Sequence, residues 1–190
     1  MTDSAGLPSR ADALSLLREY TEKPGLLKHA YAVEAAMRAY APRYGGDPDS
    51  WGLVGLLHDF DYERWPSLED HPYRGSEILE QKGYPEWFRR AIMSHAPYTG
   101  VTRDSDLEKA LFACDELCGF LTACALVTPG KSLAEVKVKS VKKKMKAKAF
   151  AASVNREDIR EGAADLELEL DAHIEFCLEA LRGIAGELEL

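Results

Sequence analysis

Residues 51–65 read WGLVGLLHDFDYERW, and the fold class follows most directly from this stretch. Its first seven residues are all apolar side chains or glycines. They follow Asp-Pro-Asp-Ser at residues 47–50, a pattern typical of a helix N-cap with proline at the first helical position. The stretch therefore predicts a buried helix that ends in two polar side chains, His58 and Asp59.

Helix signals also dominate on both sides of this stretch, and strand patterns are nearly absent. Ser9 with Asp12 and Ser105 with Glu108 have the spacing of capping boxes, which open helices. Glycine or proline separates several of the periodic segments. The segments expected to be helical are 10–20, 24–40, 48–58, 72–83, 85–95, 105–127, a lysine-rich segment within 137–148, and a long last helix over 155–183.

These segments predict a single all-α domain. The 190 residues suffice for one substantial core, and no internal repeat or Pro/Ser-rich linker divides them. We expect one compact helical bundle over residues 1–190, with its motif-bearing core at about 20–125 and a helical extension at about 131–184. The extension is expected to end in the long C-terminal helix.

Several polar residues fall on the apolar faces of these helices, among them His29, His95 and Asp115 in addition to His58 and Asp59. A lone histidine on such a face is more often a core residue with satisfied hydrogen bonds. Burying this many polar side chains is costly unless a partner or a metal compensates. Imidazole and carboxylate ligands suit Fe, Mn, Co, Ni and Zn, and the lack of cysteine in the set argues against a structural zinc site.

The order His29, His58-Asp59, Asp115 resembles that of the HD superfamily of metal-dependent phosphohydrolases. The resemblance covers about residues 20–125 and extends to the surrounding sequence. The similar stretches are LLKHAYAVE at 26–34, GLLHDFDYERW at 55–65, HPYRGSEIL at 71–79 and ACDELCGF at 113–120. The resemblance implies an HD-type helical bundle and a hydrolase.

In the two-metal branch of that superfamily the ligand order is His, His-Asp, His, His, Asp. The resemblance therefore implies two divalent metal ions, whose identity among Fe, Mn, Co, Ni, Zn and Mg the sequence leaves open. Asp59 would bridge the two ions. The implied ligands are His29, His58 and Asp115 for one ion and His71 and His95 for the other.

The expected reaction is hydrolysis of a small phosphomonoester or phosphodiester, with a nucleotide as one candidate, by metal-activated water. Asp61 is a candidate catalytic residue beside Asp59, because it could orient a ligand or the attacking water. A phosphate substrate also needs cationic donors. The candidate substrate-binding residues are Lys28, Arg64 and Arg74.

Two other functions stay open at this point. The same ligand order resembles that of HD-type di-iron oxygenases, which use O₂ to cleave C–C or C–P bonds. A non-catalytic domain that binds a nucleotide or a partner is a third class, although the complete ligand set argues against it. The tripeptide Gly83-Tyr84-Pro85 names the cyclic-di-GMP phosphodiesterases, but here it precedes His95 and is interpreted as a helix stop.

The charges are unevenly distributed. The net charge is −8, yet residues 137–148 carry seven lysines and no acid, which leaves 17 of the 24 basic residues against all 32 acidic ones elsewhere. An acidic chain is a poor candidate for a nucleic-acid binder, and its lysine-rich segment lacks the interleaved arginine and aromatic residues that such binding favours. The lysines are interpreted as a solvated helix face, with contact to the acidic C-terminal helix or guidance of an anionic substrate as alternatives.

The chain is expected to be cytoplasmic and not to engage a membrane. No apolar run approaches the length of about 18 residues that spans a bilayer, and residues 1–10 lack the apolar segment of a signal peptide. Four cysteines without a CxxC pair fit reduced, buried thiols. His173 is interpreted as a packing histidine of the last helix, whose apolar seam could pack within the chain or across a homodimer.

Overall fold

In the computed structural model of the chain, residues 6–190 are described, and over this range helices alternate with turns and no strand occurs. This confirms the all-α prediction. Residues 1–5, on which part of the expectation about a signal peptide rests, lie outside the described range. Within residues 6–190, the helices are too short or too polar to serve as membrane spans. The α-helices are α1 Arg10–Tyr20, α2 Pro24–Tyr40, α3 Pro48–Leu57, α4 Tyr73–Gln81, α5 Glu86–Ser94, α6 Asp106–Leu126, α7 Val138–Met145, α8 Arg156–Asp165, α9 Leu170–Arg182 and α10 Ala185–Leu188.

Polar caps set the helix starts where the sequence predicts them. The Ser9 side chain accepts the Asp12 backbone N–H at the start of α1, and the Ser105–Glu108 pair opens α6 in the same way. Asp47 caps α3 by accepting the Ser50 backbone N–H. Because α3 begins at Pro48, its last turn brings His58 and Asp59 to its C-terminal end.

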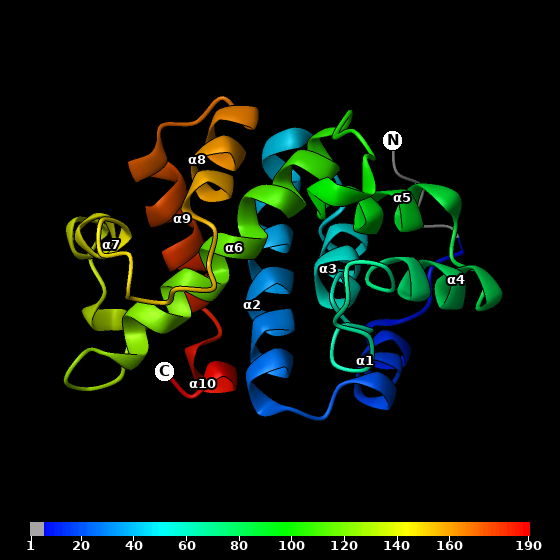
Figure 1. Ribbon diagram of the computed structural model, residues 1–190, viewed down its shortest axis with the longest axis horizontal. Helices are drawn as coiled ribbons and strands as arrows, with labels where there is room; N and C mark the ends of the chain where they lie inside the picture. Colours follow the sequence, from blue (N-terminus) through cyan, green and yellow to red (C-terminus); the bar gives the residue numbers. More distant parts are fainter. Residues whose placement is uncertain (1–5) are drawn as a thin grey trace.

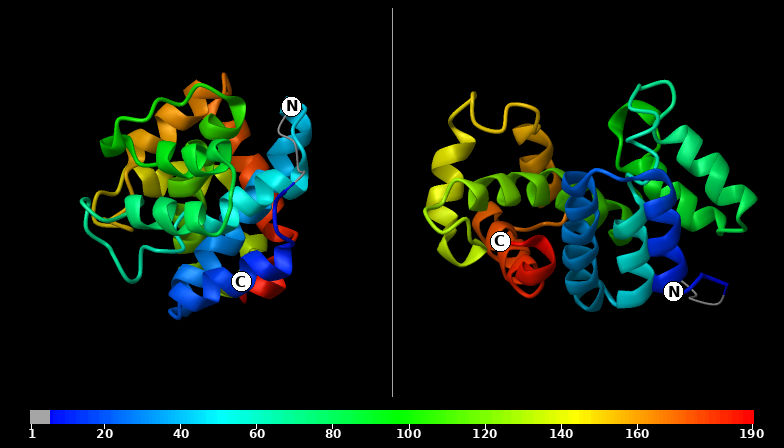
Figure 2. Two further views of the ribbon diagram at one scale, coloured as in Figure 1. Left: turned by 90° about the vertical axis from the view of Figure 1, so that its right-hand side faces the viewer. Right: turned by 90° about the horizontal axis from the view of Figure 1, so that it is seen from below.

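Helix α2 lies at the centre of the molecule. Figure 1 shows α1 and α3 on one side of it and α8 and α9 on the other, and the views in Figure 2 agree. Helix α3 packs very closely against α2 because residue 55 is glycine. A β-carbon there would lie 2.9 Å from the Val33 carbonyl oxygen and 3.0 Å from Met37 Cγ. This close packing sets the C-terminal end of α3 beside His29 of α2.

Helix α6 crosses α2 and completes the core around it (Figure 1). Most of its apolar side chains are buried, including Leu111, Leu117 and Leu121. Asp115 lies in the middle of this apolar helix, on the side that faces α2 and α3. The fold therefore places a carboxylate that is only 20% exposed at the edge of the core, where it needs partners.

The prediction of one long C-terminal helix over 155–183 is wrong in one respect, because the segment forms two helices, α8 and α9. The chain turns between them at Glu167, which adopts a left-handed backbone conformation with φ of 56°. The N–H of Leu168 then donates to the Ala163 carbonyl oxygen at 2.9 Å, which closes the end of α8. No glycine or proline marks this turn, so the sequence carries no ordinary stop signal. The break lets α8 pack on α6 while α9 packs on α2 within the same chain.

The lysine-rich helix α7 ends at Met145, before the end of the lysine-rich segment 137–148. Val141 and Met145 are buried, whereas the residues 146–149 that follow the helix are exposed. Lys142 forms an ion pair of 2.6 Å with Asp171 of α9. Within residues 6–190 the other lysines of 137–148 form no ion pair. A largely solvated helix face with one contact to α9 is therefore present.

His173 is a core histidine, as predicted. Its side chain is fully buried and bridges three helices. Its Nδ1 lies 2.7 Å from the Tyr40 hydroxyl, and its Nε2 lies 2.9 Å from the Ala113 carbonyl oxygen. The four cysteines are all buried free thiols, as predicted, and none belongs to a metal-ligand cluster of the described residues.

Candidate metal centre

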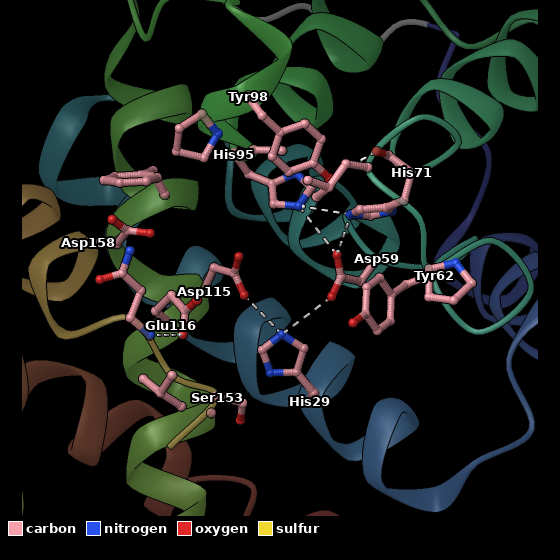
Figure 3. Close-up of a pocket in the computed structure, with 18 residues that line it drawn as sticks. His29, Asp59, Tyr62, His71, His95, Tyr98, Asp115, Glu116, Ser153 and Asp158 are labelled. Carbon is pink, nitrogen blue, oxygen red and sulfur yellow. Dashed lines mark hydrogen bonds and ion pairs between the residues drawn. The ribbon is translucent and has the colours of Figure 1, made fainter. Parts of the chain in front are cut away.

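Five helices or their flanking turns bring six polar side chains to one place. Figure 3 shows His29, Asp59, His71, His95 and Asp115 converging around one cavity. His29 comes from α2 and Asp115 from α6. The remaining four come from segment ends: His58 and Asp59 follow α3, His71 precedes α4, and His95 follows α5. All six ligands implied by the resemblance are therefore brought together.

The six residues form two ligand clusters that share Asp59. One cluster is His29, His58, Asp59 and Asp115, and the other is Asp59, His71 and His95. Each of the two carboxylate oxygens of Asp59 faces a different cluster. Its Oδ2 lies 3.6 Å from His58 Nε2, whereas its Oδ1 lies 3.2 Å from His71 Nε2 and 3.3 Å from His95 Nε2. A carboxylate in this position can bridge two ions.

The spacing of the ligand atoms fits metal coordination. Ligands at about 2.1 Å from one ion lie roughly 3.0 to 3.4 Å apart in tetrahedral or octahedral geometry. His29 Nε2 lies 3.0 Å from Asp115 Oδ1 and 3.2 Å from His58 Nε2, and the Nε2 atoms of His71 and His95 are 3.4 Å apart. Ring nitrogens that converge at these distances are a donor set for a cation.

Hydrogen bonds at the far side of three imidazoles set which nitrogen faces the centre. His58 Nδ1 donates to the Gly55 carbonyl oxygen at 2.8 Å, and His95 Nδ1 donates to the Ile92 carbonyl oxygen. His71 Nδ1 donates to Asp61 at 2.8 Å. In neutral imidazoles this leaves each Nε2 lone pair directed toward the cluster, as metal ligation requires. The six residues therefore fit a pair of divalent ions.

Asp61 contacts the candidate metal ligand His71 and does not line the cavity. Its side chain is fully buried, and it accepts one hydrogen bond from His71 Nδ1 and a second from the Gly75 N–H, both at 2.8 Å. A β-carbon at residue 75 would lie 2.8 Å from the Asp61 carboxyl carbon, which explains the glycine in HPYRGSEIL. Of the two roles expected for Asp61, the structure supports orientation of His71, because the buried carboxylate does not line the cavity.

Replacing Asp61 by alanine is expected to weaken metal binding at the His71–His95 cluster by about 10- to 100-fold, because His71 loses the acceptor that fixes its tautomer. Titration of the metal-free variant with Mn²⁺, followed by calorimetry, measures this. Asp70→Ala is the matched control, since Asp70 lies in the same loop and pairs with the exposed Arg74. Equal affinity in the wild type and Asp61→Ala would contradict this role.

Without metal, hydrogen bonds and charge attraction between protonated histidines and carboxylates stabilise the centre. Burial by itself would raise the pKa of the Asp59 carboxyl, but the charge on His58 and hydrogen bonds from His71 and His95 keep this pKa well below its usual range. Burial would likewise lower the pKa of His71, but hydrogen bonds to Asp59 and Asp61 raise it to about 10. At neutral pH the metal-free His71 therefore carries a proton on the nitrogen that faces the centre.

Metal binding is accordingly expected to release protons at pH 7.5, at least the one from His71, and the apparent metal affinity should increase as the pH rises toward about 10. The sign follows because deprotonation of His71 precedes its ligation. Calorimetric titrations in buffers of different ionisation enthalpy count the protons released. In His71→Ala the count should fall by about one. Metal binding with no proton release would contradict this prediction.

The clusters open into a cavity of about 690 Å³. Its wall includes the aromatic side chains of Tyr62, Tyr98 and Phe112, and the segment 153–155 lines one side. The cavity size is that of a small-molecule site. Asp59 and Asp115 are 22% and 20% exposed, so both carboxylates remain reachable from the cavity although His58 is fully buried behind them.

The three cations predicted to bind substrate do not line this cavity. Lys28 pairs with Glu189 at 2.6 Å near the C-terminus. Arg64 lies over the Tyr20 ring at 4.3 Å and donates to the Glu19 carbonyl oxygen. Arg74 pairs with Asp70 and Glu77 on the surface of α4. A substrate role for any of them stays a prediction that the arrangement of side chains does not support.

Two further carboxylates line the cavity wall, Glu116 and Asp158, and neither was predicted from the sequence. Burial, together with the neighbouring charge of Asp115, raises the pKa of Glu116 to about 7. Burial also raises the pKa of Asp158. Glu116 could have been predicted near the site, because it directly follows Asp115 in ACDELCGF. Asp158 could not, because its sequence pattern indicates only the start of a helix.

The fold and this site define an all-α protein with a His/Asp ligand set for divalent metal. Comparison with protein families agrees, because residues 26–118 match the family model described as HD domain. The chain therefore contains an HD domain, a type of domain that binds divalent metals and generally acts as a hydrolase. The matched segment includes all six ligand residues. No curated protein and no solved structure matches the chain.

Proposed function

We propose that this protein is a metal-dependent phosphohydrolase that acts on a small phosphomonoester or phosphodiester at a dinuclear centre. The observation that carries the proposal is the shared carboxylate, with one oxygen of Asp59 directed to each ligand cluster at the floor of a cavity. Two ions held on either side of one carboxylate are a frequent arrangement for phosphoryl transfer to water.

The residues of the centre have separate roles. Asp59 holds the two clusters in register, while His29, His58 and Asp115 on one side and His71 with His95 on the other complete the ligand set. Bound divalent ions supply positive charge for the phosphoryl oxygens and lower the pKa of a coordinated water. Asp61 keeps His71 in the ligating tautomer. Tyr98 donates its hydroxyl to the His71 carbonyl oxygen at 2.9 Å and so fixes the cavity wall beside that ligand.

The test is release of product from p-nitrophenyl phosphate and bis(p-nitrophenyl) phosphate by the full chain. The metal-free protein is loaded separately with Mn²⁺, Co²⁺, Ni²⁺, Fe²⁺, Zn²⁺ or Mg²⁺ and assayed in air and under nitrogen. Hydrolysis with at least one metal, unchanged under nitrogen, supports the proposal. No hydrolysis with any metal would contradict it, and O₂ consumption by the iron form would favour the oxygenase alternative.

A further inference from the structure

The wall of the cavity away from most of the ligands is acidic and has no basic side chain. Glu116 of α6 and Asp158 of α8 line it, and Figure 3 places both on the side opposite His71. No lysine or arginine is among the residues that line the cavity, over the described range 6–190. An enzyme for phosphorylated substrates usually supplies such cations, so their absence needs an account.

Both wall carboxylates keep acceptor capacity for a ligand. Glu116 uses Oε2 to accept the Asn155 backbone N–H at 3.1 Å, and within residues 6–190 its other oxygen has no protein hydrogen bond. Asp158 forms no ion pair within that range. The nearby guanidinium group of Arg103 is already engaged, because it pairs with Glu161 and with Asp165.

The charges constrain what can enter beside the metals. Two divalent ions would bring four positive charges, of which Asp59 and Asp115 offset two as ligands. Asp158 offsets further positive charge near the centre, and so does Glu116 in its ionised form. A polyphosphate would place additional negative charge against these two carboxylates, which is unfavourable in a partly buried cavity. A substrate with one phosphoryl group and one cationic group matches both sides of the cavity, with the phosphoryl group at the metal ligands and the cationic group at the acidic wall.

We infer that the substrate is a phosphoester that also carries a protonated amine, and that Glu116 and Asp158 bind this amine. The inference rests on the proposed phosphohydrolase function, since the metal centre is what places the phosphoryl group. A third metal ion is a weaker fit for the wall. Neither Glu116 nor Asp158 belongs to a cluster of three ligand atoms among the described residues, whereas an ammonium group needs only one or two carboxylate acceptors.

The experiment compares aminoalkyl phosphates of increasing chain length with alkyl phosphates of the same length, using the metal-loaded full chain and measuring phosphate release. At least one aminoalkyl phosphate is expected to have a kcat/KM about tenfold or more above its alkyl counterpart, mainly through KM. Equal kcat/KM values for every matched pair would overturn the inference. Hydrolysis of none of these esters, nor of p-nitrophenyl phosphate, would instead contradict the proposed function itself.

Variants then locate the selectivity. Asp158→Asn and Glu116→Gln keep the shape of each side chain and remove its charge, so each should reduce the ratio of the two kcat/KM values severalfold toward one. Glu157→Gln is the matched control. It removes one charge from the residue next to Asp158, but Glu157 is exposed, pairs with Arg160 and does not line the cavity. A preference for the amine that survives the Glu116→Gln/Asp158→Asn double variant would overturn the assignment.

Discussion

Asp59→Ala is expected to lower kcat/KM for phosphoester hydrolysis by about a thousandfold or more. The reason is that Asp59 belongs to both ligand clusters, so its loss weakens both metal sites together. It also leaves His58, His71 and His95 facing each other without the carboxylate that they contact at 3.2 to 3.6 Å. No other single ligand reaches both clusters.

The measurement is initial-rate hydrolysis of p-nitrophenyl phosphate by metal-supplemented wild type and variant. Asp49→Ala is the matched control, because Asp49 lies in the first turn of the helix that leads to Asp59, is exposed and pairs with Arg38. The control should retain activity within about twofold. Circular dichroism verifies that Asp59→Ala remains folded. Full turnover by a folded Asp59→Ala protein would contradict a catalytic role for the bridge.

His173→Ala is expected to lower the free energy of unfolding by about 2 to 4 kcal/mol. His173 is fully buried, and its Nε2–H donates to the Ala113 carbonyl oxygen while its Nδ1 accepts from the Tyr40 hydroxyl. Alanine leaves both of these buried groups without a partner and opens a cavity among α2, α6 and α9. The effect concerns stability alone, since His173 belongs to neither ligand cluster.

Urea unfolding of the metal-free proteins measures this difference. Tyr40→Phe serves as the matched variant, because it removes the hydroxyl and keeps the ring that packs 4.3 Å from the Phe176 centroid. The Tyr40→Phe/His173→Ala double variant should be less destabilised than the sum of the two single variants, because both remove the same hydrogen bond. A change below about 0.5 kcal/mol for His173→Ala would show that this network does not stabilise the core.

The sequence was most informative where a local pattern has one physical solution. The capping boxes at Ser9 and Ser105 and the cap at Asp47 fixed the starts of three helices, because their side chains satisfy backbone groups of the same turn. Five of the six candidate ligands were also predictable, since polar residues on otherwise apolar helix faces must meet a partner, whereas His71 was implied only by the resemblance to HD-type proteins. The grouping of these ligands around Asp59 agrees with the resemblance to HD-type proteins.

The sequence was least informative where contacts join distant segments. The turn at Glu167 has no glycine or proline, and it is held by packing of α8 on α6 and of α9 on α2. Lys28 is paired by Glu189, which lies 161 residues away, so no local pattern could show that it is occupied. Asp158 enters the cavity wall only because α8 folds back onto α6. Identifying cavity-wall residues therefore required the three-dimensional arrangement.

The central claim is that the six His and Asp residues form a centre for two divalent ions. Elemental analysis of the protein purified without added metal tests it most directly, with wild type, Asp59→Ala and Asp49→Ala compared side by side. Wild type and Asp49→Ala should retain up to about two transition-metal ions per chain, and Asp59→Ala should retain close to none. A wild-type protein that holds no metal, even after incubation with Mn²⁺ or Fe²⁺, or an Asp59→Ala variant with the same metal content as the wild type, would contradict the claim.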